Sequence, residues 1–156
     1  MTMLYEEIET NYISSETLPW VPFAPYSDEV FLKYYRIDPV RGEILVSMRF
    51  PSTVQLPTHY HTGLVIAHTV KGAWRYLEHD WVSKAGDTVY ETAGSSHTPD
   101  AVEDSEVFFV IVGELEFVDQ DGNLLARENW STSMQRYLAY CEANGIEAHD
   151  LTSFAH

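Results

Sequence analysis

The stretch that decides the fold reads THYHTG at residues 58–63, and its partner downstream reads ETAGSSHT at residues 91–98. Side chains alternate across a β-strand, so His59 and His61 would point to the same face, roughly 7 Å apart along the chain. His97 in the second stretch could supply a third imidazole from another strand. Imidazole nitrogen binds iron, zinc, copper, nickel or manganese. The pattern therefore predicts a metal centre with His59, His61 and His97 as its ligands.

A pair of histidines two residues apart is weak evidence by itself, because many surface loops contain one. The alternative is three unrelated histidines, two in a loop and one in a turn. The surrounding glycines favour the metal centre: Gly72 follows His61 by eleven residues, and Gly86 and Gly94 both precede His97.

Glu91 lies six positions before His97 and is the acidic residue of the second stretch. It could be a fourth ligand, a residue that orients a ligand or a bound water, or a base that removes a substrate proton. The alternative is a carboxylate in an exposed turn. We expect Glu91 to act at the site, as a catalytic residue or as a partner of the ligands.

Short runs of β-branched and aromatic residues, separated by turn residues, follow one another along most of the chain. We predict strands over residues 30–37, 43–50, 64–70, 73–79, 107–112, 114–118 and 124–126, with another between 81 and 91. The run at 107–112 is continuously apolar, which is typical of a strand buried on both faces. About eight to ten short strands at this spacing predict an all-β fold, a jelly-roll barrel or sandwich.

Only the end of the chain has a helical pattern, with apolar residues at positions 134, 137, 138 and 141. Ser131 or Thr132 could cap a short C-terminal helix, and Asn144-Gly145 could end it. We expect a single domain over residues 1–156, with an N-terminal arm at residues 1–17 and a frayed tail at residues 146–156.

The net charge of −15 disfavours nucleic acid and anionic membranes as partners, because both repel an acidic surface. No apolar run is long enough to span a bilayer. The first ten residues lack the basic, apolar pattern of a signal peptide. Cys141 is the one cysteine, so no internal disulfide can form. We therefore expect a cytoplasmic protein.

The spacing of histidines and glycines over roughly residues 50–101 resembles the two signature motifs of the cupin superfamily. Further strings are LPWVPF at residues 18–23, the aromatic stretch with Trp74, Tyr76 and Trp81, and the Glu91-to-Thr98 segment. Together they resemble the 2,4'-dihydroxyacetophenone dioxygenase family over roughly residues 18–130. The spacing of Glu91 and the hairpin FVDQDG at residues 117–122 are also similar to acetylacetone dioxygenase, a related cupin with three histidine ligands.

The chain departs from the cupin pattern at four places, and one of them has a chemical consequence. Thr53, Thr92 and Ala101 stand where glycine, proline and asparagine are usual, and Val65 or Ile66 stands where the motif has a glutamate. Three neutral imidazoles would leave a divalent ion its full charge. Such an ion is a stronger Lewis acid toward an anionic, bidentate oxygen ligand such as an enolate.

The resemblance implies a non-haem iron(II) dioxygenase with His59, His61 and His97 as iron ligands. It implies that O2 is used to split an aryl hydroxyketone, such as 2,4'-dihydroxyacetophenone, into an aryl carboxylate and formate. Three alternatives stay open: a diketone dioxygenase, a cupin isomerase or hydrolase that uses zinc, nickel or manganese as Lewis acid, and a cupin that binds a small ligand without catalysis.

The sequence does not define the substrate pocket. Trp74, Tyr76, Phe108 and Phe109 are candidates for an aromatic wall, although aromatic residues in a small barrel more often form plain core. Cupins commonly pair, so we expect a homo-oligomer. Whether the N-terminal arm is exchanged between subunits is left open.

Overall fold

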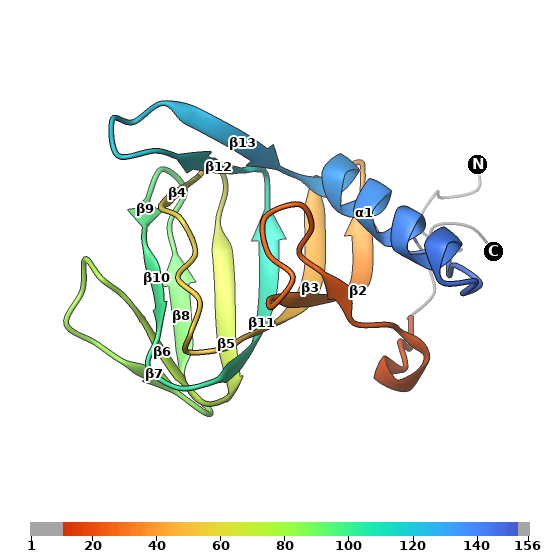
Figure 1. Cartoon of the computed structure of the whole chain (residues 1–156), viewed down its shortest axis with the longest axis horizontal. Coiled ribbons are helices and arrows are strands. Elements are labelled where there is room, and N and C mark those ends of the chain that lie inside the picture. The colour runs from red at the N-terminus through yellow and green to blue at the C-terminus, as the bar shows by residue number, and fades with distance from the viewer. Residues whose placement is uncertain (1–10, 153–156) are drawn as a thin grey trace, which may run out of the picture.

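The structure is a computed structural model, and it describes residues 11–152. Its strands form three antiparallel sheets that curve around one core, followed by one helix (Figure 1). The largest sheet has the strand order β1 (Val21–Pro22), β2 (Phe31–Asp38), β3 (Glu43–Phe50), β11 (Ser105–Val112), β5 (Val65–Lys71) and β8 (Thr88–Glu91).

The two smaller sheets complete the wall opposite. One has the order β13 (Leu124–Glu128), β12 (Leu115–Val118), β4 (His59–His61) and β9 (Ser96–His97). The other has the order β10 (Pro99–Ala101), β6 (Ala73–Tyr76) and β7 (Ser83–Lys84). A short 3-10 turn, η1 (Ser15–Thr17), precedes them, and α1 (Trp130–Ala143) follows them beside β2. The predicted all-β jelly-roll fold with a C-terminal helix is confirmed.

Strand β5 has the alternation that a sheet with one covered face requires. Val65, Ala67 and Thr69 are buried, whereas His68 is exposed and its Nδ1 lies 3.0 Å from the Thr88 hydroxyl. In β11 only Ser105 and Val107 are buried and residues 108–112 are all half-buried, so the prediction that residues 107–112 are buried on both faces is wrong. Val107 belongs to the core, and Phe109 and Ile111 pack against it while partly exposed.

The N-cap of the helix lies two residues before Ser131 and three before Thr132, the two caps expected from the sequence. Asn129 is the N-cap: its Oδ1 accepts hydrogen bonds from the backbone N–H groups of Ser131 (2.9 Å) and Thr132 (3.1 Å). The Thr132 hydroxyl accepts a bond from the Asn129 N–H, which completes a reciprocal cap. The predicted end is confirmed, with Asn144 as C-cap and Gly145 at a φ of 63°. No helix within residues 11–152 is long and apolar enough to cross a bilayer.

The segment that follows the helix is docked where we predicted a frayed tail. Leu151 is buried, and its carbonyl accepts a hydrogen bond from the Ile37 N–H at 2.9 Å. The His149 N–H donates to the Tyr137 hydroxyl at 2.9 Å. Residues 1–10, which hold most of the expected arm, lie outside the described part of the chain.

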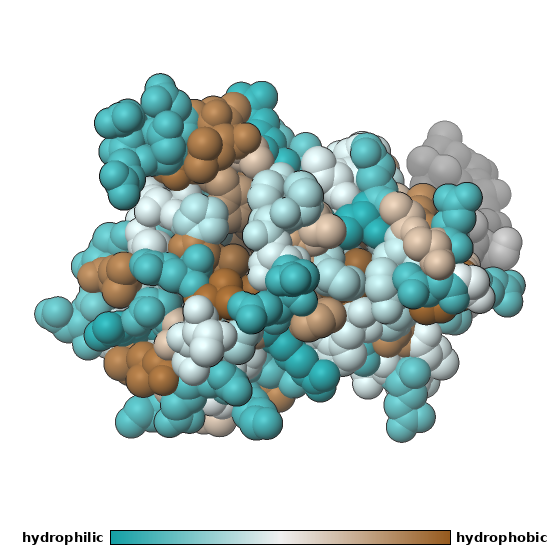
Figure 2. Space-filling view, in the orientation of Figure 1, coloured by the Kyte–Doolittle hydropathy of each residue, from teal (hydrophilic) through white to brown (hydrophobic). Residues whose placement is uncertain are grey.

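The face seen in Figure 2 is mostly hydrophilic, in line with the net charge of −15. Apolar side chains gather over the hairpin of β12 and β13, where Leu124 and Leu125 are exposed. This hairpin stands at the end of the barrel that carries β4 and β9.

The turn after β4 is held by a close approach of two backbones. A Cβ added to Gly63 would lie 2.1 Å from the Val112 carbonyl oxygen, which is closer than any side chain can come. Beside it, the Thr62 N–H donates to the Glu114 carbonyl at 3.0 Å, and the Glu114 N–H donates to the Thr62 hydroxyl at 2.8 Å. Glycine at position 63 therefore fixes where β4 ends and where His61 stands.

We predict that Gly63→Ala lowers the free energy of unfolding by about 3 kcal/mol, because the two backbones must separate. Gly122→Ala is the control, since Gly122 has a φ of 81° but nothing within 4 Å of an added Cβ. It should cost only about 1 kcal/mol, from backbone strain alone. Urea unfolding of both variants measures this, and equal losses would contradict the steric account.

Candidate metal centre

The three histidines come from two adjacent strands. His59 and His61 lie on β4, and His97 on β9 pairs directly opposite His59. All three are buried, whereas Tyr60 between the first two is exposed. The ring centroids are 4.7 Å apart for His59 and His61, 5.4 Å for His61 and His97, and 6.5 Å for His59 and His97. The strand alternation predicted for His59 and His61 thus turns both inward.

Glu91 joins this cluster from the end of β8. Its Oε2 lies 3.6 Å from His61 Nε2, which is too long for a hydrogen bond. The donor atoms of His61, Glu91 and His97 all lie within 4.8 Å of one another, so these three could hold one ion. The structure therefore brings the four predicted site residues together, with Glu91 placed as a candidate ligand. The ligand roles of His59, His61 and His97 stay predictions.

Several polar atoms at this point lack partners within the described part of the chain. They are both ring nitrogens of His61, Nδ1 of His97 and Oε2 of Glu91. A buried polar atom without a hydrogen bond costs about 1–3 kcal/mol, so such a group needs an explanation. A cation between the rings would accept the lone pairs of all three residues.

The other ring atoms are oriented by neighbours. His97 Nε2 lies 2.9 Å from the Ser95 hydroxyl, and His59 Nδ1 lies 3.4 Å from the Pro57 carbonyl. Such partners fix the ring orientation and leave the opposite nitrogen for an ion. His97 Nδ1 and His59 Nε2 are the nitrogens left in this way.

The electrostatics of the site suit neutral donors. Burial lowers the pKa of His59 to about 4 and the pKa of His61 to about 3, and it also lowers the pKa of His97. The imidazoles are therefore uncharged at neutral pH, with lone pairs available. Burial raises the pKa of Glu91 to about 8, so this carboxyl carries a proton at neutral pH unless a cation is bound.

Tyr76 is a functional neighbour whose role the sequence did not reveal. Its hydroxyl donates a hydrogen bond to Glu91 Oε1, which leaves Oε2 on the side of His61. Its ring stacks on His97, with centroids 4.2 Å apart. Tyr76 thus orients one carboxylate oxygen and one imidazole at once.

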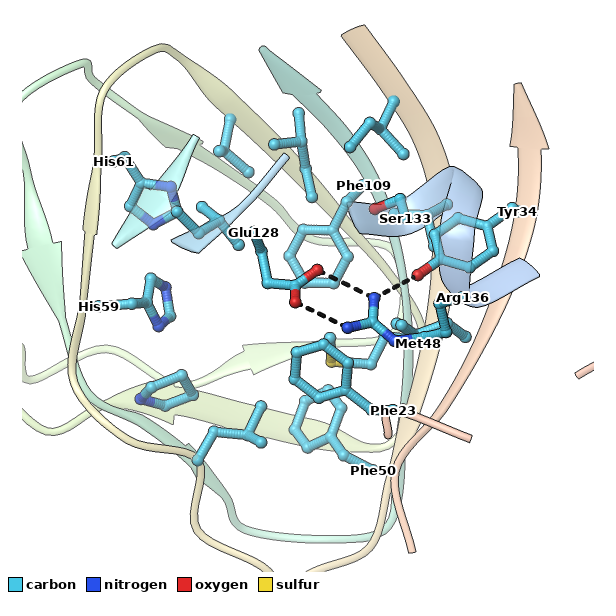
Figure 3. A pocket seen from close by; sticks show the side chains of 18 of the residues that line it. Phe23, Tyr34, Met48, Phe50, His59, His61, Phe109, Glu128, Ser133 and Arg136 are labelled. Atoms are coloured by element: carbon cyan, nitrogen blue, oxygen red, sulfur yellow. Dashed lines mark hydrogen bonds and ion pairs between the residues drawn. The ribbon is translucent and has the colours of Figure 1, made fainter. Parts of the chain in front are cut away.

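An apolar cavity leads from the histidines into the barrel (Figure 3). The space between its lining atoms, with open solvent at the mouth included, is about 750 Å³. Of the aromatic candidates, Tyr76 and Phe109 line it, whereas Trp74 is core and Phe108 packs edge-on against Tyr35. The other apolar side chains around it are Phe23, Leu32, Ile44, Val46, Met48, Phe50, Leu56, Val65, Pro99, Ile111 and Leu115.

A second hollow reaches the same site. Tyr76 lines both hollows, and Glu91 and His97 line this one together with His79 and Trp81. The candidate metal centre therefore borders two hollows, with His59 and His61 lining the apolar one and Glu91 and His97 lining the other.

Residues 9–116 match the ChrR cupin-like domain, and the chain belongs to this family of cupins. The predicted cupin superfamily is thereby confirmed. The chain is 49% identical to an RmlC-like cupin of Ralstonia eutropha, with 98% of this chain and 100% of that chain covered and a TM-score of 0.93. No curated protein matches the chain.

The structure is also similar to an acetylacetone dioxygenase from Acinetobacter johnsonii. The TM-score is 0.75 at 20% identity, over 89% of this chain and 97% of that chain. At this identity the likeness shows a shared fold alone. The resemblance to the 2,4'-dihydroxyacetophenone dioxygenase family stays a prediction.

We predict that His61→Ala removes most of the bound metal, because it deletes the donor nearest to Glu91. His68→Ala is the matched control, since it also removes a histidine, but one that lies on the exposed face of β5. Elemental analysis after iron loading measures the metal. A hundredfold excess of iron over Kd should stabilise the wild type and His68→Ala by about 2.7 kcal/mol, and His61→Ala by much less. Equal metal content in the two variants would contradict the assignment.

We also predict that metal affinity rises with pH up to about 8. Below its raised pKa Glu91 holds a proton that the ion must displace, which weakens binding by about tenfold per pH unit. The buried histidines have already lost their protons in this range. Glu91→Gln should flatten the dependence, as followed by competition with a colorimetric chelator. A slope that survives in Glu91→Gln would assign the proton to another group.

Proposed function

We propose that this protein is a metal-dependent dioxygenase that cleaves a carbon–carbon bond of an aryl hydroxyketone such as 2,4'-dihydroxyacetophenone, giving an aryl carboxylate and formate. The observation that carries the proposal is the cluster of uncharged, buried imidazoles, of which His59 and His61 line an apolar cavity. Iron(II) is the proposed ion, and O2 is the proposed second substrate.

The donors fit such an ion. His61, His97 and Glu91 offer two imidazoles and a carboxylate, which is a donor set typical of non-haem iron oxygenases, and His59 could add a third imidazole. When bound, the ion would supply two kinds of chemistry: it would react with O2, and it would act as a Lewis acid toward the oxygens of the ketone. The orphaned atoms of His61, His97 and Glu91 are what this ion would satisfy.

The chain itself would contribute binding, orientation and a proton acceptor. The apolar walls exclude water from the reacting carbon, with Phe109 and Phe50 among the side chains that could contact an aryl ring. If the three histidines alone hold the ion, Glu91 Oε2 would stay free to take a proton from the substrate, because Tyr76 holds the other oxygen. A carboxylate with a pKa raised to about 8 is a stronger base than an exposed one.

The proposal is supported by the resemblance of the sequence motifs and by the shared fold of an acetylacetone dioxygenase. A diketone is therefore the nearest alternative substrate. Both substrates present two oxygens to one ion, and they differ in the group that must fit the apolar cavity.

The test is to load the protein with iron(II) without oxygen, add 2,4'-dihydroxyacetophenone, and then admit O2. We predict that oxygen is consumed and formate appears in equal amounts, and that His61→Ala loses at least about a hundredfold in rate. An oxygen electrode and a formate assay measure both. No oxygen uptake with any hydroxyketone or diketone would remove the proposal.

A second candidate follows from the same donor set. Two histidines and one carboxylate also hold catalytic zinc, so a cupin isomerase or hydrolase that uses zinc, nickel or manganese as Lewis acid is the alternative. Turnover that survives strict exclusion of oxygen would favour it over the dioxygenase.

A further inference from the structure

The wall of the apolar cavity carries a polar cluster that the metal centre does not use. It consists of Tyr34 on β2, Glu128 at the end of β13, and Ser133 and Arg136 on α1, and we call it the far cluster. In Figure 3 it lies across the cavity from His59 and His61. The side chains of Arg136 and Glu128 are only 8% and 7% exposed.

The far cluster is neutral as a whole. Arg136 Nη2 donates to Glu128 Oε1 at 2.7 Å, and Nη1 donates to Oε2 at 2.9 Å, so the two charges pair in a bidentate bridge. Nη1 also donates to the Tyr34 hydroxyl at 2.9 Å, and Nε donates to the Ala24 carbonyl at 2.8 Å. Burial raises the pKa of Tyr34, which keeps this phenol protonated.

The far cluster keeps hydrogen-bonding capacity for a ligand. Because the Tyr34 oxygen accepts from Arg136, its own hydrogen is left for Ser133 or for a group in the cavity. Glu128 offers a ligand little, because its Oε2 already accepts from Arg136 and from the Thr132 hydroxyl, both at 2.9 Å, and its Oε1 accepts from Arg136. A hydroxyl that enters here can therefore accept a hydrogen bond from Tyr34.

An anion fits this place poorly. The positive charge of Arg136 is already matched by Glu128, so a second carboxylate would be buried without a counter-charge. A substrate with only a hydrogen atom at this end would leave the polar groups of the far cluster facing an apolar surface.

We propose that the far cluster recognises a neutral hydroxyl on the end of an apolar substrate that is remote from the histidines, and that it rejects a carboxylate there. Tyr34 is the specificity-determining residue in this assignment. The choice of aryl substrates rests on the proposed function, whereas the recognition itself needs no turnover.

The alternative is a purely structural bridge that ties α1 to β13 and β2. Buried ion pairs are often no more stabilising than apolar residues of the same volume, so stability alone explains the far cluster weakly. A structural bridge would not alter the preference among ligands, and this difference can be measured.

The test is calorimetric titration of the purified protein, without oxygen, with three ketones that differ only at the para position. They are 2-hydroxyacetophenone, 2,4'-dihydroxyacetophenone and 4-(hydroxyacetyl)benzoate. We expect the para-hydroxyl compound to bind about tenfold more tightly than the unsubstituted one, which corresponds to about 1.4 kcal/mol. The carboxylate should bind at least about tenfold more weakly than the hydroxyl compound.

Tyr34→Phe should reduce the preference for the hydroxyl compound to about twofold or less. Tyr35→Phe is the control on the same strand, because the Tyr35 hydroxyl contacts Ser47 and does not line the cavity, and it should keep the tenfold preference. Equal binding of the hydroxyl and unsubstituted compounds, tightest binding of the carboxylate, no binding of any of them, or a preference unchanged in Tyr34→Phe would each overturn the proposal.

The wild-type comparison does not depend on any variant folding. The outcomes also separate this proposal from the dioxygenase. Preferential binding without oxygen uptake would keep the far cluster and remove the oxygenase, whereas turnover without para preference would do the reverse.

Discussion

The structure depends on one electrostatic constraint: four ionisable side chains are buried at a single point, and several of their polar atoms have no protein partner among the described residues. Three imidazoles with lowered pKa values and one carboxyl with a raised pKa would be a costly arrangement by themselves. A bound cation would offset this cost, because it would coordinate the free lone pairs and stabilise the charged form of the carboxylate. The pairing of β4 with β9 brings His97 opposite His59, and the tight turn at Gly63 fixes the end of β4 next to His61.

The carboxylate reaches the site by an unusual route for the motif that the sequence resembles. The motif places its glutamate near residue 65, where this chain has valine. In the structure, Glu91 on β8 is the direct cross-strand neighbour of Val65 on β5. A side chain from the adjacent strand therefore enters the region that the missing glutamate would occupy. The Glu91 carboxylate would then neutralise part of the charge of the ion. Two ligand shells are therefore possible: the three histidines alone, as predicted from the sequence, or histidines together with Glu91.

The sequence predicted what local periodicity controls. His59 and His61 had to share a face, the turn residues marked the strands, and Asn144-Gly145 marked the end of the helix. It could not reveal contacts set by the closure of the barrel. Arg136 meets Tyr34 across 102 positions of the chain, and Tyr76 meets Glu91 across strands of different sheets. The sequence also did not predict that Leu151 docks on β2, because a single apolar residue in a polar tail gives no periodic pattern.

The most direct test of the metal centre is anomalous X-ray diffraction from a crystal loaded with iron(II) under anaerobic conditions. We predict one anomalous peak about 2 Å from the donor atoms of His61, His97 and Glu91, with His59 facing the same ion. A peak bound by other residues, or no peak between these rings in protein that has been exposed to excess iron, would contradict the account.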